Sequence, residues 1–263
     1  MWNDQQVSVV LMTYAERDSI RSVIDGFFAT GHVDEVLVVD NNAQPGTREE
    51  VALTRARTVH ETEQGYGHAT RRGLLEARGD IIVLAEPDGT FLPEDIVKLL
   101  VYSAECDAVF GTRTTLELVW KDANMNGLLR WGNWAVAKLV EFLFNTSHLS
   151  DVGCTYRLLR RETARFVAGR MTVGGSHAGA EIMLLTILSG ARFVEVPVNY
   201  LPRVGKSSVT GNVLTAVSVG LSMVDLILST RLRTPLRRRR PAAFVAPRPG
   251  APSETKREMA AGP

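Results

Sequence analysis

The chain has 263 residues, of which 45% are hydrophobic and 22% charged, and its net charge is +1. This is the composition of an ordinary soluble globular protein, long enough for one large α/β domain with appendages. The two cysteines, Cys106 and Cys154, lack metal-ligand spacing, which argues against a cysteine metal centre and favours a reduced, cytosolic protein.

The small net charge hides an asymmetry. Residues 231–263 contain nine Lys and Arg against two Asp and Glu, whereas residues 1–230 contain 21 against 27. The basic character belongs to the tail, so we expect no nucleic-acid partner for the body. The polar start MWNDQQ argues against a signal peptide. No run reaches about 18 uninterrupted apolar residues, so we expect no membrane span.

Apolar runs of strand length alternate with helical patterns through the first half of the chain. The expected strands cover residues 7–13, 33–40, 57–61, 81–85 and 107–111. The expected helices cover residues 18–28, 47–56, 65–78 and 93–105. Four such repeats predict right-handed crossovers and a mainly parallel α/β sheet with flanking helices.

The run at residues 81–85, IIVLA, is the expected central strand of this half of the chain. It is solidly apolar, as in a strand covered on both faces, and it ends in Glu86-Pro87-Asp88. Two carboxylates two residues apart at a strand end can hold a divalent cation that binds phosphate oxygens. An isolated pair of this kind is more often an acidic turn, so its neighbours decide the interpretation.

The second half predicts helices at residues 128–144, 180–189 and 210–229 and strands at 151–161 and 192–200. The first of these helices carries Trp131 and Trp134, and the last has a polar stripe opposite an apolar face. That apolar face consists of Val213, Val217, Leu221, Val224 and Leu228. We expect a domain over residues 1–208, an amphipathic C-terminal helix over 209–230 and a basic, disordered tail over 231–263.

The order of motifs resembles family 2 glycosyltransferases of the GT-A fold, and within them the polyprenyl-phosphate, dolichyl-phosphate mannose synthase-like group. The resemblance covers about residues 7–210 and rests on shared order and spacing. Its segments are TYAE at 13–16, DNN at 40–42, GYGHA at 65–69, EPD at 86–88, GTR at 111–113, DVGCTYR at 151–157, GAE at 179–181 and RVGKSS at 203–208. Three positions depart from the group: Asn41 and Glu86 each replace an Asp, and Thr90 stands where a metal-binding Gln is frequent.

The resemblance implies a nucleotide-diphosphate sugar as donor, and the EPDGT variant favours a UDP-sugar. The implied donor-binding residues are Thr13, Tyr14, Glu16, Asp40, Gly65, Gly67, Glu86, Arg203 and Lys206. Asp88 is expected to be catalytic by holding Mg²⁺ or Mn²⁺ together with Glu86. Arg113 and Arg130 are expected to be catalytic by cradling the phosphate of the acceptor.

We therefore expect a metal-dependent inverting transferase that moves a sugar to a polyprenyl phosphate. A phosphate monoester has a second pKa of about 6, so it is anionic near neutrality and needs positioning more than a general base. Two alternatives stay open. A soluble family 2 enzyme acting on a sugar hydroxyl would need a base, for which Asp151 or Glu181 is the candidate. An inactive nucleotide-sugar-binding protein is suggested by Glu86 and Asn41.

We expect the protein to be cytoplasmic and peripheral at the cytoplasmic face of the membrane. Six arginines fall between Arg231 and Arg240, and the helices at 128–144 and 213–228 have apolar faces. Basic residues near an anionic leaflet contribute about 1 kcal/mol each. Attachment would be direct or through a membrane protein partner.

Overall fold

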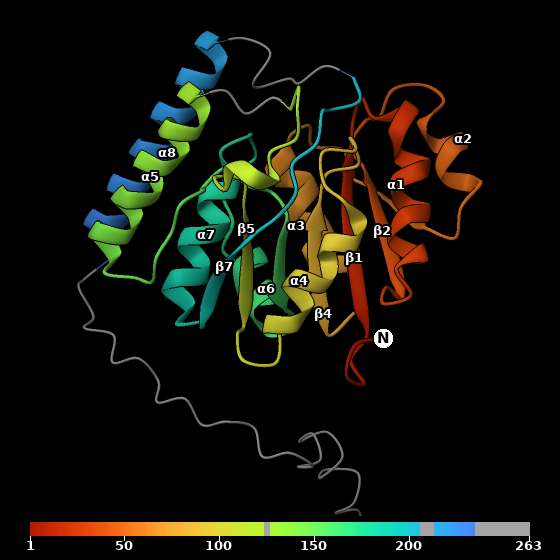
Figure 1. The fold of residues 1–263 in the computed structure, drawn as a ribbon, viewed down its shortest axis with the longest axis horizontal. Helices are drawn as coiled ribbons and strands as arrows, with labels where there is room; N and C mark the ends of the chain where they lie inside the picture. The colour runs from red at the N-terminus through yellow and green to blue at the C-terminus, as the bar shows by residue number, and fades with distance from the viewer. Residues whose placement is uncertain (124–126, 206–212, 235–263) are drawn as a thin grey trace, which may run out of the picture.

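A computed structural model describes residues 1–123, 127–205 and 213–234, and its centre is a seven-stranded sheet in the order β3-β2-β1-β4-β6-β5-β7 (Figure 1). The strands are β1 (Val7–Thr13), β2 (Glu35–Asp40), β3 (Arg57–His60), β4 (Ile81–Ala85), β5 (Ala108–Thr112), β6 (Arg157–Arg160) and β7 (Phe193–Pro197). The helices are α1 (Arg17–Ala29), α2 (Thr47–Ala52), α3 (Tyr66–Glu76), α4 (Ile96–Tyr102), α5 (Gly127–Phe144), α6 (Arg161–Ala168), α7 (Ala178–Ser189) and α8 (Val213–Arg233), with 3-10 turns at Pro93–Asp95 and Leu116–Leu118.

The expected mainly parallel sheet is confirmed. Strands β1 to β4 pair in parallel with their neighbours, as do β5 and β7, and only β6 runs antiparallel, between β4 and β5. Strand β6 covers only Arg157–Arg160, so the strand that we expected over residues 151–161 is too long. Residues 151–156 form a loop instead, because the buried Arg157 side chain donates to the carbonyl oxygens of Cys154 and Val152 at 2.7 and 2.6 Å. The chain enters helix α6, which we did not predict, directly after β6.

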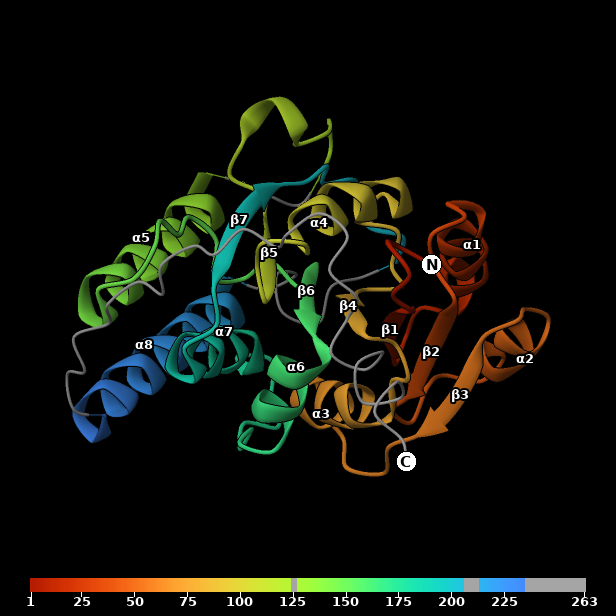
Figure 2. The same ribbon diagram turned by 90° about the horizontal axis from the view of Figure 1, so that it is seen from below.

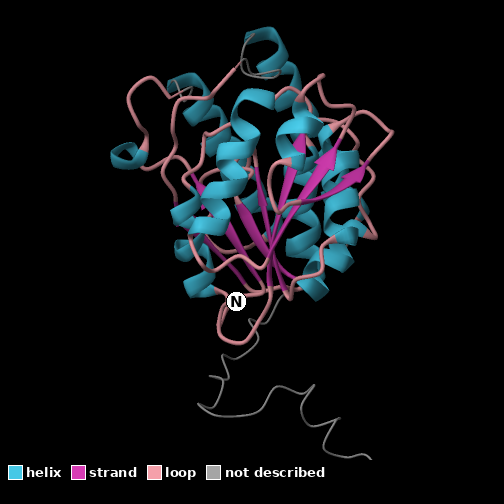
Figure 3. Ribbon diagram, turned by 90° about the vertical axis from the view of Figure 1, so that its right-hand side faces the viewer, coloured by secondary structure: helices cyan, strands magenta, loops and turns pink. Residues whose placement is uncertain are grey.

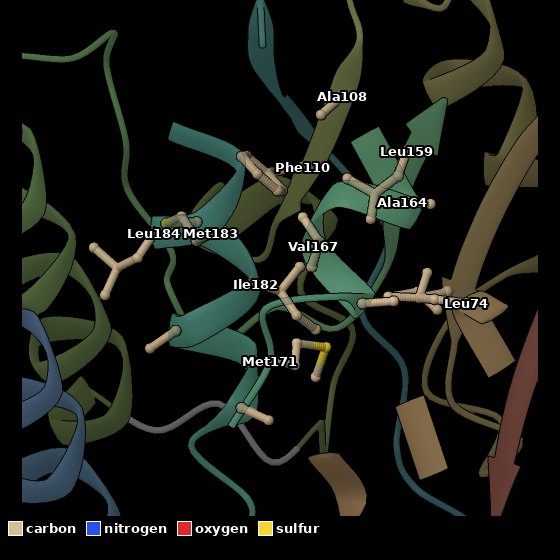
Figure 4. Packing of buried hydrophobic residues seen from close by; sticks show 14 of the residues in the cluster. Leu74, Ala108, Phe110, Leu159, Ala164, Val167, Met171, Ile182, Met183 and Leu184 are labelled. Carbon is tan, nitrogen blue, oxygen red and sulfur yellow. The ribbon is translucent and has the colours of Figure 1, made fainter. Parts of the chain in front are cut away.

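Helices cover both faces of the sheet (Figure 3). Alternate residues of β1 point to opposite sides, so Val9 belongs to a core with α1 and α4, whereas Val10 belongs to a core with α3, α6 and α7. Figure 4 shows the second core, in which Phe110, Val167 and Ile182 converge from β5, α6 and α7. Strand β4 is buried along its whole length, as its solid apolar run predicts.

The parallel register brings the ends of three strands to one edge. Thr13 at the end of β1 pairs with Asp40 at the end of β2, and Leu11 pairs with Ala85 at the end of β4. The segments that follow these strands therefore start side by side. This is the edge at which open α/β sheets bind ligands.

Helices α5 and α8 lie side by side at the flank of the molecule, next to α7 (Figures 1 and 2). Helix α8 packs inward through Met223, Leu226 and Ile227. In the face that we identified as apolar, Val217, Leu221 and Leu228 are turned outward and exposed. The large exposed side chains of α8, together with those of α5, form a surface that we call the α5–α8 ridge: Trp131, Trp134, Phe142, Leu214, Val217, Leu221, Leu228 and Leu232.

Helix α8 also bears on two expectations. It continues to Arg233, and Arg231 donates from Nε to the carbonyl oxygen of Leu143 at 2.9 Å, so the tail does not begin at residue 231. We expected no membrane span. Among the described residues, the segment Leu214–Arg233 is nevertheless long and apolar enough to cross a membrane, judged by length and composition alone, and 6% of its apolar window is buried. The expected tail from residue 235 onward lies outside the described residues.

Candidate active site

Glu86 and Asp88 follow β4 directly and form a pair of acidic side chains at the ligand edge of the sheet. Asp88 is fully buried. Its Oδ1 accepts hydrogen bonds from the Thr90 backbone nitrogen at 2.9 Å and from Thr90 Oγ1 at 2.6 Å. Thr90 therefore fixes the orientation of Asp88 and leaves the other carboxylate oxygen facing the site.

That other oxygen, Asp88 Oδ2, is buried and makes no hydrogen bond. Arg203 Nη2 lies 2.6 Å from it, which satisfies the distance of an ion pair but not the angles of a hydrogen bond. The same nitrogen donates to Glu86 Oε2 at 2.7 Å. Burial and the neighbouring charge of Asp88 together raise the pKa of Glu86 to about 7, although Arg203 opposes the shift. The pair is thus short of positive charge even beside the arginine.

The residues fit a hard divalent cation such as Mg²⁺ or Mn²⁺, because carboxylate oxygens are its preferred ligands and Asp88 Oδ2 has an unused lone pair. No group of three or more His, Cys, Asp or Glu side chains gathers anywhere in the described part of the chain. A cation at Glu86 and Asp88 would consequently need further ligands from a bound phosphate or from water. Lys206, which we expected near the donor, lies outside the described residues.

The loop after β1 is shaped by Glu16. Its Oε2 accepts hydrogen bonds from the backbone nitrogens of Tyr14 and Ala15 at 2.8 and 2.9 Å and from Thr13 Oγ1 at 3.2 Å. Thr13 is buried, whereas 55% of Tyr14 is exposed. Glu16 therefore holds the loop, and the Tyr14 ring is free to stack on a planar ligand.

Asp40 and Asn41, at the end of β2, are both buried and both bonded within the protein. Asp40 accepts from the Ala43 backbone nitrogen at 2.8 Å and pairs with Arg48. Asn41 Nδ2 donates to the carbonyl oxygens of Glu61 and Glu63, and its Oδ1 accepts from the Gly65 nitrogen at 2.8 Å. A carboxylate could not donate the first two bonds, so the replacement of an acid by Asn41 has a structural reason. This structural reason could not be inferred from the sequence motif alone.

Gly65 and Gly67 are explained by packing of the chain on itself. A Cβ atom on Gly67 would collide with the carbonyl oxygen of Val173, and one on Gly65 with that of Gly174. The Gly67 nitrogen already donates to the Gly174 oxygen at 2.8 Å. We expected these two glycines to approach a ligand. Residues 173–174 of the protein itself instead occupy the side on which a Cβ atom would lie.

Arg113 is held by Asp151. Its Nε and Nη2 donate to the two carboxylate oxygens at 2.8 and 2.9 Å, and its guanidinium lies 5.1 Å from the centre of the Tyr200 ring. Burial by itself would raise the pKa of Asp151, but the charge and hydrogen bonds of Arg113 outweigh it and lower that pKa. Asp151 is thus an ionised partner of Arg113 with both oxygens engaged.

Glu181 is engaged in a different place. Its two carboxylate oxygens accept from the Thr172 nitrogen at 2.9 Å, from Thr172 Oγ1 at 2.7 Å and from the Val173 nitrogen at 2.9 Å. It therefore anchors the segment that covers Gly65 and Gly67. Both candidates for a general base are accordingly committed to structural contacts.

A cavity of about 910 Å³ lies between α5, the end of β5 and the edge strand β7. Arg130 lines it, but Arg113 does not, because Arg113 is turned toward Asp151 and Tyr200 while its neighbours Thr112 and Thr114 face the cavity. The structure does not bring the two arginines into a single cradle. Sequence reasoning missed this because it did not consider that successive side chains of an extended segment point to opposite sides.

The same reasoning missed a cluster of hydroxyl groups in the cavity wall. Thr112, Thr114 and Ser150 lie within 2.8–2.9 Å of one another, and Ser150 Oγ donates to Glu195 Oε2 at 2.5 Å. Burial raises the pKa of Glu195, against the opposing effect of its bonds with Ser150. Trp131 and Trp134 line the opposite, apolar side. The cavity thus combines an arginine, hydroxyl donors and aromatic rings, which suits a ligand with a small polar head and an apolar body.

Comparison with known proteins gives one family and a set of relatives. Residues 8–166 match the model of the family described as Glycosyl transferase family 2. A dolichyl-phosphate hexose transferase of Haloferax volcanii is 30% identical over 230 residues, covering 86% of this chain and 96% of the relative. An undecaprenyl-phosphate mannosyltransferase of Micrococcus luteus is 27% identical over 229 residues, covering 82% of this chain and 93% of the relative.

Solved structures agree on the fold. The crystal structure of glucosyl-3-phosphoglycerate synthase from Mycobacterium tuberculosis, in complex with Mn²⁺, UDP and phosphoglyceric acid, superposes with a TM-score of 0.68. The superposed residues cover 88% of this chain and 80% of the synthase, and the sequence identity is 19%. At this identity the likeness concerns the fold, which is the expected GT-A arrangement.

Proposed function

Because the chain belongs to glycosyl transferase family 2, we propose that it transfers a sugar from a nucleotide-diphosphate sugar to a polyprenyl phosphate, with inversion at the anomeric carbon. One observation carries the choice of acceptor. Asp151 is bound by Arg113 and Glu181 by residues 172–173, so neither carboxylate is free to deprotonate a hydroxyl. A phosphate monoester needs no such base, because it is already anionic near neutrality.

The donor occupies the edge formed by the ends of β1, β2 and β4. Tyr14 stacks on the base, and Asp40 accepts from a ribose hydroxyl once the largely exposed Arg48 side chain releases its Oδ2. Glu86 and Asp88 would hold Mg²⁺ or Mn²⁺. When bound, the cation neutralises charge on the departing diphosphate. We favour a UDP-sugar, a choice supported by the EPDGT segment and by the fold shared with an enzyme that was crystallised with Mn²⁺ and UDP.

The acceptor phosphate binds in the cavity beside α5. Arg130 supplies a planar pair of donors, and the hydroxyl groups of Thr112 and Thr114 supply further ones when they turn away from Ser150. Trp131 and Trp134 contact the first apolar part of the lipid. Arg113 keeps its positive charge fixed behind this wall, next to Tyr200, and limits repulsion between acceptor and donor phosphates.

The α5–α8 ridge brings the protein to its lipid substrate at the cytoplasmic face of the membrane. A polyprenyl chain resists leaving the bilayer at about 0.8 kcal/mol per exposed CH₂ group. The exposed tryptophans and leucines of the ridge and the arginines between residues 231 and 240 suit an anionic bilayer surface. The two cysteines are both free, in agreement with a cytoplasmic location.

Membrane attachment is tested by co-sedimentation with anionic vesicles at low and high salt. Leu221→Asp, in the ridge, should strongly reduce binding, whereas Leu53→Asp, at an equally exposed position after α2, should not. A variant truncated after Thr234 keeps α8 and removes the rest of the tail. It should therefore lose mainly the part of vesicle binding that is sensitive to salt. If the intact protein does not co-sediment with such vesicles at low salt, the proposal of direct attachment is wrong, and attachment would require a membrane protein partner.

Transfer to a sugar hydroxyl is the second candidate, and it would require Asp151 or Glu181 to leave its present partners. The hypothesis of an inactive nucleotide-sugar-binding protein was based on Glu86 and Asn41. Asn41 no longer supports it, because this residue has a structural role of its own.

The function itself is tested by incubating the protein with a panel of nucleotide sugars and undecaprenyl phosphate and analysing the lipids by mass spectrometry. We expect a sugar-phosphate lipid from one donor. Arg130→Ala should weaken use of the acceptor by about 1.5–3 kcal/mol without changing donor affinity, and Arg130→Lys should restore little, because it lacks the planar fork. Donor binding with no lipid product from any sugar would favour the inactive protein.

A further inference from the structure

The acidic pair at the end of β4 already has a cationic occupant. Arg203 Nη2 lies 2.7 Å from Glu86 Oε2 and 2.6 Å from Asp88 Oδ2. One guanidinium nitrogen therefore touches both carboxylates on the side where a divalent cation would need them. Thr90 holds the remaining oxygen of Asp88, so the carboxylate cannot turn to offer another.

The backbone on both sides of Arg203 is tied to the same acidic turn. The Leu201 nitrogen donates to the carbonyl oxygen of Thr90, and the Val204 nitrogen donates to that of Asp88, both at 2.9 Å. These bonds keep the Arg203 Cα beside the pair. The long side chain, however, can swing about its own torsions without breaking them.

The present contact is a weak form of arginine pairing. Arginine pairs best with a carboxylate through two parallel hydrogen bonds, as Arg113 does with Asp151. Arg203 instead places one nitrogen between two carboxylates and leaves Asp88 Oδ2 without a hydrogen bond. A phosphate group, which offers several oxygens to the planar fork, would be a better partner.

We infer that Arg203 and a divalent cation are alternative occupants of the Glu86–Asp88 pair, and that entry of the cation moves the Arg203 guanidinium onto the diphosphate of the donor. Two positive charges about 4 Å apart repel strongly in a partly buried site, so both cannot sit on these oxygens. The inference rests on the proposed function only in placing a cation at this pair. It adds that cation and diphosphate must bind cooperatively, because the diphosphate gives the displaced arginine a new partner.

The first test measures Mn²⁺ binding to the nucleotide-free protein by the electron paramagnetic resonance signal of free Mn²⁺. Arg203→Gln should bind Mn²⁺ about tenfold more tightly than the wild type or better, since the competing charge is gone. Arg17→Gln makes the same change of net charge at an exposed position and should bind as the wild type does. Addition of UDP should tighten Mn²⁺ binding to the wild type more than to Arg203→Gln.

The second test reads the arginine directly. Phenylglyoxal labelling followed by peptide mass spectrometry should show Arg203 reacting several-fold faster at a saturating Mg²⁺ concentration. Arg113, which is 11% exposed and held by Asp151, should react at an unchanged rate. Unchanged Arg203 labelling at saturation, or equal Mn²⁺ affinity of wild type and Arg203→Gln, would overturn the inference and leave the metal site in place. Failure of every protein to bind Mn²⁺, with and without UDP, would overturn the metal site of the proposed function as well.

Discussion

Arg113 donates three hydrogen bonds to Asp151: from its backbone nitrogen at 3.1 Å and from Nε and Nη2 at 2.8 and 2.9 Å. Asp151 is fully buried and 11% of the Arg113 side chain is exposed. A buried pair of this geometry fixes both partners in their charged states. It therefore removes Asp151 from the set of possible bases and keeps a permanent positive charge beside Tyr200.

Asp151→Asn should destabilise the protein by about 3–5 kcal/mol, because it leaves a buried guanidinium without its counter-charge. Urea unfolding at neutral pH measures the change. The matched control is Asp18→Asn, which breaks an ion pair with Arg17 in which both side chains are about half exposed or more, and should cost less than about 1 kcal/mol. Equal losses in the two variants would contradict the structural role of the buried pair.

Asp88→Asn should abolish turnover and remove the metal-dependent stabilisation of the protein by nucleotide. The asparagine retains an oxygen for the two Thr90 bonds, so the turn survives, but it replaces the oxygen that faces the cation site. In thermal shift experiments with Mn²⁺ and UDP at about 100 times its Kd, the wild type should gain about 2.7 kcal/mol and the variant almost nothing. An unchanged gain in the variant would place the cation elsewhere.

Gly67→Ala and Gly220→Ala should change stability in opposite directions, although both substitutions fall within helices. The added methyl group meets the carbonyl oxygen of Val173 in the first case and nothing within 4 Å in the second. We expect a loss of about 1–3 kcal/mol for Gly67→Ala and a gain of about 0.5–1 kcal/mol for Gly220→Ala. Thermal unfolding decides the matter, and a neutral Gly67→Ala would mean that residues 173–174 move aside freely.

Glu195→Gln should change the pH dependence of stability. Burial raises the pKa of Glu195 above its ordinary value of 4.5, so the folded wild type keeps this proton to higher pH than the unfolded chain does. Wild-type stability from this group is present below pH 4.5 and is lost as the pH rises through the folded-state pKa. The variant has no such loss. Its stability relative to wild type should therefore increase from pH 4.5 upward and then level off, as measured by urea unfolding at several pH values; a constant difference would contradict the burial effect.

Local sequence determined much of the fold. The bounds of β1 and β4 agree with prediction, because β1 is a mainly apolar run that ends at Thr13 and β4 is a solid apolar run followed by Glu86. The short strand β6 could not be read correctly, since four residues carry no sign of strand direction. For α8 the helical pattern identified which face is apolar, but only the tertiary structure showed that much of this face is exposed and that Ile227 packs inward.

The position of Asp88 was predictable, because it follows its own strand, β4, at the edge of the sheet. The site was not predictable where the partner comes from a distant segment. Asn41 is explained by the loop at residues 61–65, and Gly67 by the backbone at residues 173–174. Arg113 and Arg130 share a residue type, but the direction of each side chain depends on packing that no motif encodes.

The most direct test of the account compares two acceptors that differ only in the phosphate. Undecaprenyl phosphate and undecaprenol are supplied at equal concentration with the accepted nucleotide sugar and Mn²⁺, and transfer of labelled sugar into the lipid fraction is measured under single-turnover conditions. The account predicts rapid transfer to the phosphate and at least about a hundredfold slower transfer to the alcohol, because the site offers the alcohol no free base. Equal or faster transfer to the alcohol would contradict it and would return Asp151 or Glu181 to consideration as the catalytic base.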